Sequence, residues 1–176
     1  MIPGFVLAGG QSLRMGQDKA LVEIAGKPLA RRLAEVLQRA GCAPVSLVGR
    51  QPALGALGLP VIRESAVGHH PLFGVAAALG TLEKGLALFA PCDLLHLEPS
   101  HIARLLETGQ PCVAEGPRGV HPLLVVLPTI LGERAEALAE AGAPAHALVE
   151  GLLRVTLPEA ALQDANRPVD LPQPPE

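Results

Sequence analysis

The chain opens with a short apolar run that passes directly into a glycine-rich loop and then into a helical pattern. The apolar run covers residues 2–8, and the loop holds Gly9, Gly10 and Gly16. Apolar side chains then recur at helical spacing over residues 27–40. A strand, a tight loop and a helix in this order begin a parallel sheet with crossover helices, so the sequence predicts an α/β fold.

The remainder of the chain continues this alternation of short strands and longer helices. Short apolar runs predict strands at residues 45–48, 61–62, 86–90, 112–114, 123–127 and 152–157. Apolar stretches at helical spacing predict helices over residues 72–82, around 102–106 and over 130–141. The run at 86–90 is apolar throughout, which is typical of a central strand buried on both faces.

Length and composition fit one domain that binds no nucleic acid. A chain of 176 residues, 49% of them hydrophobic, can bury a sizeable core. Residues 1–170 are predicted to form a single domain, and the proline-rich residues 171–176 a flexible tail. With three Phe and neither Trp nor Tyr, the chain lacks aromatic platforms for single-stranded nucleic acid. The net charge of −3 also disfavours a nucleic-acid surface.

The cysteines and the apolar runs bear on the cellular compartment. Cys42, Cys92 and Cys112 are widely spaced and odd in number, which favours neither a disulfide framework nor a zinc site. No apolar run approaches the length of a membrane span, and the first residues do not have the pattern of a secretory signal. These features predict a cytoplasmic protein that has no membrane partner.

The glycine-rich loop has the composition of a phosphate-binding site. Glycines let successive backbone N–H groups converge on an anion without a Cβ in the way. Arg14 adds a guanidinium fork and Lys19 an ammonium point charge, although charges near a turn are usually solvated. The Walker pattern is excluded because Gly16 is followed by Gln17 and Asp18. Asp18 either orients Lys19 or pairs with Arg14, or it caps a helix.

The loop also resembles the signature of a known enzyme family. Residues 7–21 read Leu-Ala-Gly-Gly-Gln-Ser-Leu-Arg-Met-Gly-Gln-Asp-Lys-Ala-Leu, which is similar to the signature of the molybdenum cofactor guanylyltransferases. The resemblance continues at Gly26-Lys27-Pro28-Leu29, Pro71-Leu72-Phe73-Gly74, Pro91-Cys92-Asp93, His121-Pro122 and Asn166-Arg167-Pro168. It implies a Rossmann-like nucleotidyltransferase fold, a three-layer sandwich around a mostly parallel central sheet.

The resemblance further implies the reaction and its partners. The expected reaction is transfer of GMP from GTP to molybdopterin or the molybdenum cofactor, with Mg²⁺ as cofactor and pyrophosphate as the second product. Molybdoenzymes and other cofactor-biosynthesis proteins are further expected partners. The predicted nucleotide-binding residues are Leu7, Ala8, Gly9, Gly10, Lys19, Glu64 and Asp93, and the predicted catalytic residues are Arg14, Lys19 and Asp93.

Asp93 is the predicted magnesium ligand. It follows the predicted central strand, where its carboxylate would lie beside the phosphate loop if both strands are parallel. Magnesium takes one or two carboxylates together with nucleotide phosphates, and the resemblance assigns this role to the Asp of Pro91-Cys92-Asp93. Without the resemblance, capping of the next turn would be the simpler role for this Asp.

Base recognition is where the chain departs from the family pattern. Glu64 stands where the family has an Asp near the base, and a carboxylate there can accept hydrogen bonds from N1 and N2 of guanine. The family places an Asn in the segment that corresponds to residues 45–50, and this chain has no amide side chain there. Other groups must therefore recognise the base.

Several polar residues have two interpretations of similar weight. His121 matches a family position near the pterin side, and Asp164 and Asn166 are candidates for metal or second-substrate binding, but all three also suit turns. His69 and His70 precede Pro71 in a predicted loop; neighbouring histidines rarely share a metal without further ligands.

Two other functions stay open at this point. One is a CTP-dependent molybdopterin cytidylyltransferase or a sugar-phosphate nucleotidyltransferase; the Gly9-Gly10 pair favours guanine only by analogy. The other is a non-catalytic GTP-binding accessory protein of molybdoenzyme maturation. The presence of both Lys19 and Asp93 favours an enzyme, because a protein that only binds GTP does not need a carboxylate that positions metal.

Overall fold

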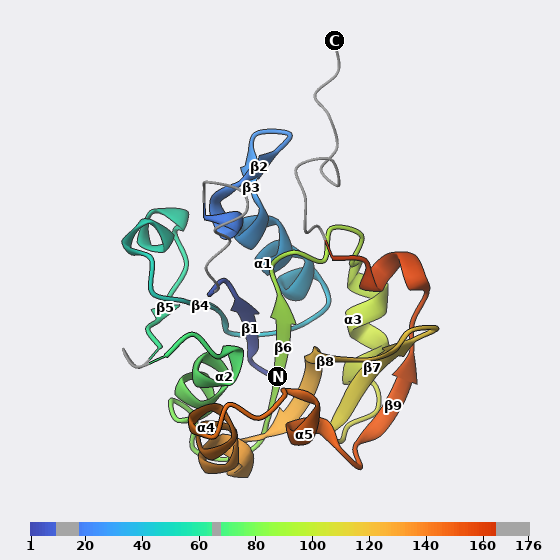
Figure 1. Ribbon diagram of the computed structural model, residues 1–176. Helices are drawn as coiled ribbons and strands as arrows, with labels where there is room; N and C mark the ends of the chain where they lie inside the picture. Colours follow the sequence, from blue (N-terminus) through green and yellow to red (C-terminus); the bar gives the residue numbers. More distant parts are fainter. Residues whose placement is uncertain (10–17, 65–67, 165–176) are drawn as a thin grey trace.

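The computed structural model describes residues 1–9, 18–64 and 68–164, which form an α/β sandwich around one large sheet (Figure 1). This sheet has seven strands in the order β5-β4-β1-β6-β8-β7-β9. Their bounds are β1 Gly4–Leu7, β4 Val45–Val48, β5 Val61–Ile62, β6 Leu86–Pro91, β7 Cys112–Gly116, β8 Gly119–Pro128 and β9 Leu153–Thr156. Strands β5, β4, β1 and β6 are parallel, β8 runs antiparallel to β6 and β7, and β9 is parallel to β7.

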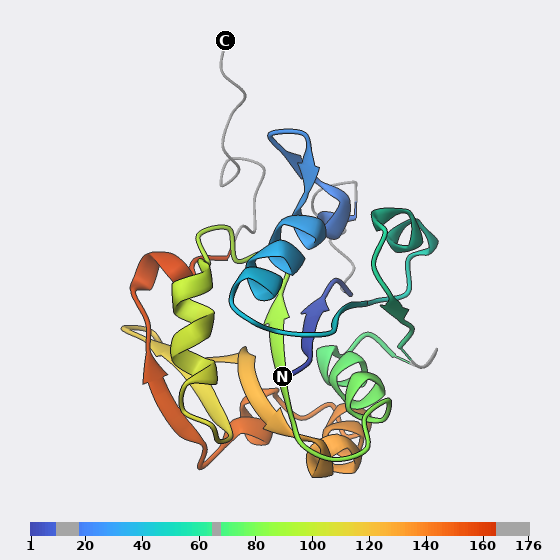
Figure 2. The same cartoon turned by 180° about the vertical axis from the view of Figure 1, so that it is seen from behind.

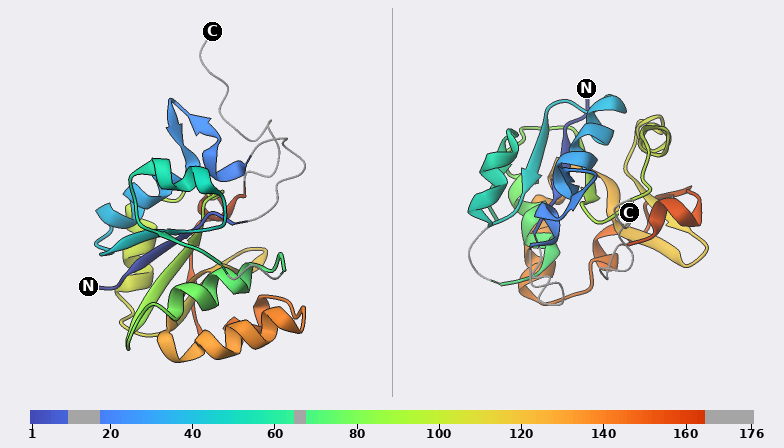
Figure 3. Two further views of the ribbon diagram at one scale, coloured as in Figure 1. Left: turned by 90° about the vertical axis from the view of Figure 1, so that its left-hand side faces the viewer. Right: turned by 90° about the horizontal axis from the view of Figure 1, so that it is seen from above.

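Helices cover both faces of the sheet and complete the three layers. The helices α1 (Leu29–Arg39) and α3 (Pro99–Leu106) contact one another on one face, as Figure 2 shows. The opposite face carries α2 (Pro71–Leu79), α4 (Gly132–Glu140) and α5 (His146–Val149), and the side view of Figure 3 separates these layers. Each face has its own apolar cluster. The predicted three-layer fold with a mostly parallel sheet is confirmed.

The apolar side chains of the first crossover helix, α1, pack against the sheet. Leu29, Leu33 and Leu37 recur at intervals of one helical turn, and all three are buried against the sheet. Burial of such a side chain contributes about 1.5–3 kcal/mol. The helix begins two residues later than the predicted 27–40 segment, because β3 (Lys27–Pro28) pairs antiparallel with β2 (Glu23–Ile24). Strands of this length are too short to show an alternating pattern in the sequence.

Three further elements begin or end at other residues than the sequence predicts. Helix α2 begins at Pro71 and ends at Leu79, short of the predicted residue 82. A 3-10 turn over Thr129–Leu131 precedes α4, so the helix predicted at residue 130 begins at Gly132. Strand β8 begins at Gly119 rather than at residue 123, since its first half pairs with the end of β7 beyond an irregularity in the register.

One edge of the sheet gathers the ends of several strands. In the parallel part, Leu7 is in register with both Val48 and Pro91, so the residues that follow β1, β4 and β6 emerge side by side. Strand β8 runs the other way, so its first residues, near His121, lie at this same edge. Strand order reverses between β1 and β6, and such a switch point is where ligands bind in open α/β sheets.

Some predictions concern residues that lie outside the described ranges. Among them are Gly10, Arg14, Asn166 and the tail at 171–176. Within the described ranges, no helix has the length and apolar character needed to cross a bilayer. All three cysteines are free thiols; burial raises the pKa of Cys42 to about 11 and that of Cys92 to about 12.

Candidate active site

An ion pair between Lys19 and Asp93 lies at the switch point of the sheet. Lys19 begins a 3-10 turn (Lys19–Leu21) after the glycine-rich loop, and Asp93 follows the end of β6. Lys19 Nζ lies 2.8 Å from Asp93 Oδ2, and the two side chains are only 14% and 21% exposed. The fold therefore brings together the predicted phosphate-binding cation and the predicted metal-binding carboxylate, which are 74 positions apart in the sequence.

The Asp93 carboxylate has an oxygen that suits a cation. Its Oδ2 accepts from Lys19, whereas Oδ1 is buried without a hydrogen-bond partner in the part of the chain that the structure describes. A buried acceptor left unpaired is costly, and a bound cation would satisfy it. Within that same part, no three His, Cys, Asp or Glu residues form a metal-binding group. Magnesium fits this arrangement, because it takes one or two carboxylates and completes its shell with phosphate and water.

Asp18 has the capping role rather than the role of a partner to Lys19. Its Oδ1 accepts a hydrogen bond of 3.1 Å from the backbone N–H of Ala20, at the start of the 3-10 turn. Burial raises the pKa of Asp18, and the hydrogen bond from Ala20 opposes that effect. The cap fixes the turn from which Lys19 reaches Asp93. The alternative pairing with Arg14 falls outside the described residues.

The Glu64 carboxylate lies directly against the glycine-rich loop. A Cβ on Gly9 would overlap Glu64 Oε1, and a Cβ on Gly74 would lie 3.1 Å from the same oxygen. Glycine at position 9 thus permits the close approach of the carboxylate to the loop backbone. Arg50 Nε lies 3.3 Å from Glu64 Oε2, and the Glu64 side chain is only 11% exposed. Burial raises the pKa of Glu64, while the charges of Arg50 and His69 oppose the rise.

A cavity of about 340 Å³ opens beside this carboxylate, and we call it the Glu64 cavity. Its lining consists of Gly9, Arg50, Gln51, Glu64, His69, His70 and Pro71. Arg50 is held by Glu64 and by a hydrogen bond to the carbonyl of Gly68. His70 caps α2 through Nδ1, which accepts from Leu72 N at 3.2 Å. Gln51 was not among the predicted site residues, because it lies one position beyond the 45–50 segment in which the family has an Asn.

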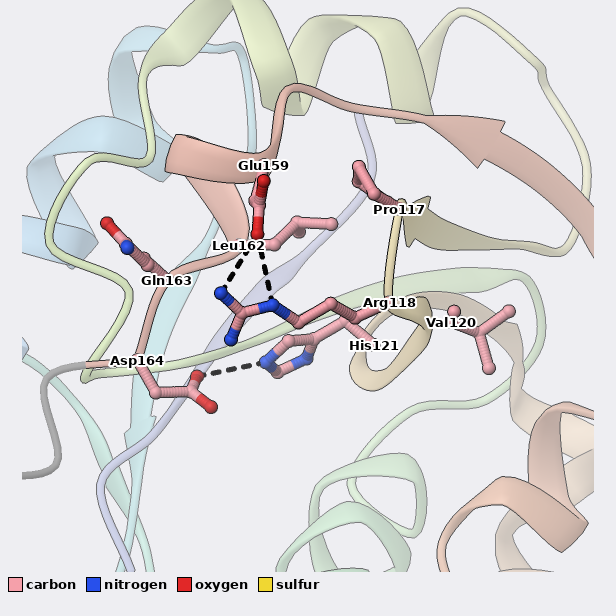
Figure 4. A pocket seen from close by; sticks show the side chains of 10 residues that line it. Pro117, Arg118, Val120, His121, Glu159, Leu162, Gln163 and Asp164 are labelled. Atoms are coloured by element: carbon pink, nitrogen blue, oxygen red, sulfur yellow. Dashed lines mark hydrogen bonds and ion pairs between the residues drawn. The ribbon is translucent and has the colours of Figure 1, made fainter.

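A second cavity, also of about 340 Å³, lies on the other side of the Lys19–Asp93 pair; we call it the His121 cavity (Figure 4). The turn between β7 and β8 forms one wall, and the 3-10 turn Glu159–Leu162 with the following residues forms the other. Arg118 Nε and Nη2 lie 3.0 and 2.9 Å from Glu159 Oε1, so the two side chains join the walls. This contact was not predictable from the sequence, because 41 positions separate the partners and neither belongs to a motif.

His121 and Asp164 line this cavity, and Asp164 connects it to the segment that holds Asp93. His121 Nε2 lies 3.1 Å from Asp164 Oδ1, as Figure 4 shows. Asp164 forms an antiparallel bridge with Leu94, the residue that follows Asp93. The hydrogen bond with His121 lowers the pKa of Asp164, and the charge of Lys19 contributes to this effect. The predicted residues His121 and Asp164 therefore lie beside the candidate metal site, and Asn166 lies outside the described ranges.

These residues form one row along the sheet edge. The Glu64 cavity lies beside the loops after β1, β4 and β5, the Lys19–Asp93 pair lies between β1 and β6, and the His121 cavity lies at β8 and β7. A cation and a carboxylate that lie between two polar cavities can stabilise charge where two bound substrates meet. Such an arrangement suits the transfer of a charged group from a ligand in one cavity to a ligand in the other cavity.

Comparison with known proteins finds relatives along most of the chain. The family described as MobA-like NTP transferase domain matches residues 4–156. A "Probable molybdenum cofactor guanylyltransferase" from Opitutus terrae is 33% identical over 135 residues, covering 72% of this chain and 66% of that relative, just under two thirds. A protein of the same description from Mycobacterium ulcerans is 31% identical over 188 aligned positions, covering 98% of this chain and 92% of that relative.

A solved structure shows the same fold. The molybdopterin-guanine dinucleotide biosynthesis protein A from Archaeoglobus fulgidus superimposes with a TM-score of 0.75 at 20% identity. The match covers 96% of this chain and 94% of that one. The fold is thus shared with a solved protein along nearly the whole chain.

Proposed function

This chain belongs to the family of MobA-like NTP transferase domains, and we propose that it transfers GMP from GTP to molybdopterin or the molybdenum cofactor and releases pyrophosphate. The observation that carries the proposal is the Lys19–Asp93 pair, 2.8 Å apart, between two cavities at the switch point of the sheet. The names of the relatives, which are molybdenum cofactor guanylyltransferases, support the choice of both substrates.

The proposed reaction needs little covalent work from the protein. An oxygen of the acceptor's terminal phosphate attacks the α-phosphorus of GTP in line and forms the new phosphorus–oxygen bond. The bond from the α-phosphorus to the oxygen that bridges it to the β-phosphate breaks, and pyrophosphate leaves with the electron pair. The acceptor phosphate is already ionised near neutral pH, so no general base is required. Positioning and charge stabilisation therefore dominate the catalysis.

The residues along this sheet edge would have different roles in binding the nucleotide and stabilising charge. The backbone of Leu7, Ala8 and Gly9 would hold the nucleotide, with Glu64 facing the base. Lys19 would neutralise the triphosphate and the leaving pyrophosphate. Asp93 would hold magnesium through Oδ1, and the ion would supply charge neutralisation at the phosphates. The roles proposed for Gly10 and Arg14 rest on the sequence motif alone.

A comparison of nucleoside triphosphates as single substrates tests the proposal. Purified protein receives molybdopterin, magnesium and one nucleoside triphosphate, and pyrophosphate release is measured. We expect release with GTP and at least tenfold slower release with CTP or UTP. Equal turnover with CTP or UTP would contradict the base assignment. Tight GTP binding without pyrophosphate release would favour the accessory-protein alternative, and turnover with a sugar phosphate in place of molybdopterin would favour the sugar-phosphate enzyme.

Arg118 provides a separate test of the acceptor side. Its pair with Glu159 is exposed, and such pairs contribute little to stability, so Arg118 can exchange Glu159 for an anionic group of the acceptor. Because a hydrogen bond to a charged group contributes about 1.5–3 kcal/mol, we expect Arg118→Ala to raise the KM for molybdopterin about tenfold or more. The KM for GTP should stay unchanged in the same steady-state measurements.

The matched control for Arg118 is Arg154→Ala. Arg154 also pairs with a carboxylate, Glu115, at 2.8 Å, and its side chain is 66% exposed, but it does not line the His121 cavity. We expect this variant to keep both KM values. A similar rise in the KM for molybdopterin in both variants would show a general effect of surface charge and would contradict an acceptor site at Arg118.

A further inference from the structure

Gln51 presents an amide to the Glu64 cavity in a fixed orientation. Its Oε1 accepts a hydrogen bond of 3.1 Å from the backbone N–H of Arg50. A backbone N–H only donates, so the amide atom against it must be the oxygen. The Nε2 group is therefore the end that remains for a ligand, and across the described ranges it has no hydrogen bond of its own.

The backbone around Gly49 brings this amide close to the glycine-rich loop. A Cβ on Gly49 would lie 2.9 Å from Gln51 Oε1 and 3.4 Å from the backbone carbon of Ala8. Glycine at position 49 thus lets the Gln51 side chain fold back over the strand end, toward the loop after β1. The Glu64 carboxylate approaches the same loop at Gly9. An amide donor and a carboxylate acceptor therefore line one cavity beside one stretch of loop backbone.

We infer that Gln51 donates a hydrogen bond to O6 of guanine while Glu64 accepts from N1 and N2, so that this pair selects the base; the inference rests on the nucleotide site of the proposed function. Guanine offers two adjacent donors followed by an acceptor, which matches a carboxylate beside an amide NH₂. Cytosine and adenine offer one exocyclic donor next to a ring nitrogen that only accepts. That ring nitrogen would face the carboxylate, with which it cannot form a hydrogen bond.

Uracil is the more demanding competitor for this site. It also presents a ring N–H beside a carbonyl oxygen, so it could satisfy Gln51 and one carboxylate oxygen. It lacks the exocyclic amine that guanine would donate to Glu64. Cytosine O2 could likewise accept from Gln51, so the proposed pair separates guanine from both cytosine and uracil through Glu64: N3 of cytosine and O2 of uracil are acceptors that would face the carboxylate. Gln51 would also supply, one residue beyond the 45–50 segment, the amide that this segment lacks.

Equilibrium binding without acceptor tests this inference independently of turnover. The probes are magnesium complexes of GTP, of ITP, which lacks the 2-amino group, and of 2-aminopurine riboside triphosphate, which lacks O6 and the N1–H. We expect Gln51→Ala to weaken GTP and ITP binding about tenfold, because it removes the donor to O6. Binding of the 2-aminopurine nucleotide should stay within twofold of wild type, since that base has no O6.

Two further variants test the direction of the hydrogen bond and the specificity of the effect. Gln51→Glu retains an oxygen for Arg50 N but places a second acceptor opposite O6, so we expect it to weaken GTP binding more than Gln51→Ala does. Gln38→Ala, on the exposed surface of α1, is the matched control and should bind all three nucleotides as wild type does.

The outcomes separate this inference from the proposed function. Unchanged GTP affinity in Gln51→Ala, or an equal loss for all three nucleotides, would overturn the role of Gln51. A loss of affinity for GTP and ITP alone would support the role of Gln51. If the wild-type protein released no pyrophosphate with molybdopterin, that result would overturn only the proposed transfer reaction. Failure of the wild-type protein to bind GTP would overturn both.

Discussion

Replacing Asp93 with Asn is expected to lower the rate of pyrophosphate release about 1,000-fold. Loss of one electrostatic stabiliser in an enclosed site costs about 100- to 1,000-fold in rate, and Asp93→Asn removes the carboxylate charge. Because Lys19 can only donate, the remaining amide oxygen should face Lys19 and the NH₂ group should take the place of the oxygen proposed to hold magnesium. Asn has nearly the same shape, so the packing after β6 is preserved. We expect the magnesium concentration needed for half-maximal activity to rise as well, which a titration at fixed GTP will measure.

The stability of the Asp93 variant distinguishes a chemical role from a structural one. Removing one partner of the pair leaves the Lys19 charge without Asp93 in a site where each side chain is less than a quarter exposed. We expect the free energy of unfolding to fall by about 1–3 kcal/mol, which is less than the cost of breaking a fully buried pair. The melting temperature should fall by several degrees. The control Glu115→Gln, which breaks the pair with Arg154, should retain activity. If the rate fell only in proportion to the fraction of protein that is unfolded, the result would contradict the catalytic role.

Replacing Lys19 with Met is expected to slow turnover about 100-fold. The methionine keeps much of the apolar stem of Lys19 but removes the ammonium that we propose to neutralise the leaving pyrophosphate. The interaction should strengthen as charge develops on the leaving group, so kcat should fall more than GTP affinity does. Steady-state kinetics together with equilibrium GTP binding will measure the two effects separately.

The double variant Lys19→Met/Asp93→Asn separates stability from catalysis. It removes both charges together, so neither charge is left without its partner at the sheet edge. We expect its melting temperature to lie above those of both single variants, while activity stays at least 1,000-fold below wild type. Recovery of activity together with stability would show that the pair serves only the fold.

The architecture could be predicted from the sequence because its main elements carry strong local patterns. The 86–90 run is the central strand β6, paired with β1 on one side and β8 on the other. The predicted strands at Val45–Val48 and Val61–Ile62 have the predicted bounds. The β2–β3 hairpin was missed, because each of its strands has only two residues and its pairing has no periodic signal. The reversed direction of β8 depends on contacts between distant segments, which periodicity does not encode.

The candidate site was predictable only where a motif marks a residue. Lys19 and Asp93 belong to motifs, and the structure places them in contact. Arg118 and Gln51 belong to no motif, and only the fold brings each to a cavity. The close approach of Glu64 to Gly9 also depends on the tertiary structure, because the two residues follow different strands.

The reversed strand β8 places the two cavities of this edge on different structural supports. The Glu64 cavity depends on loops that leave the parallel strands, and the His121 cavity depends on the hairpin of β7 and β8 and on the turn Glu159–Leu162. The β7–β8 turn can change in length or sequence without altering the parallel pairing of β1 with β4 and β6. Under the proposed function, substitutions in this hairpin would therefore change the acceptor that is bound while leaving the donor nucleotide site unchanged.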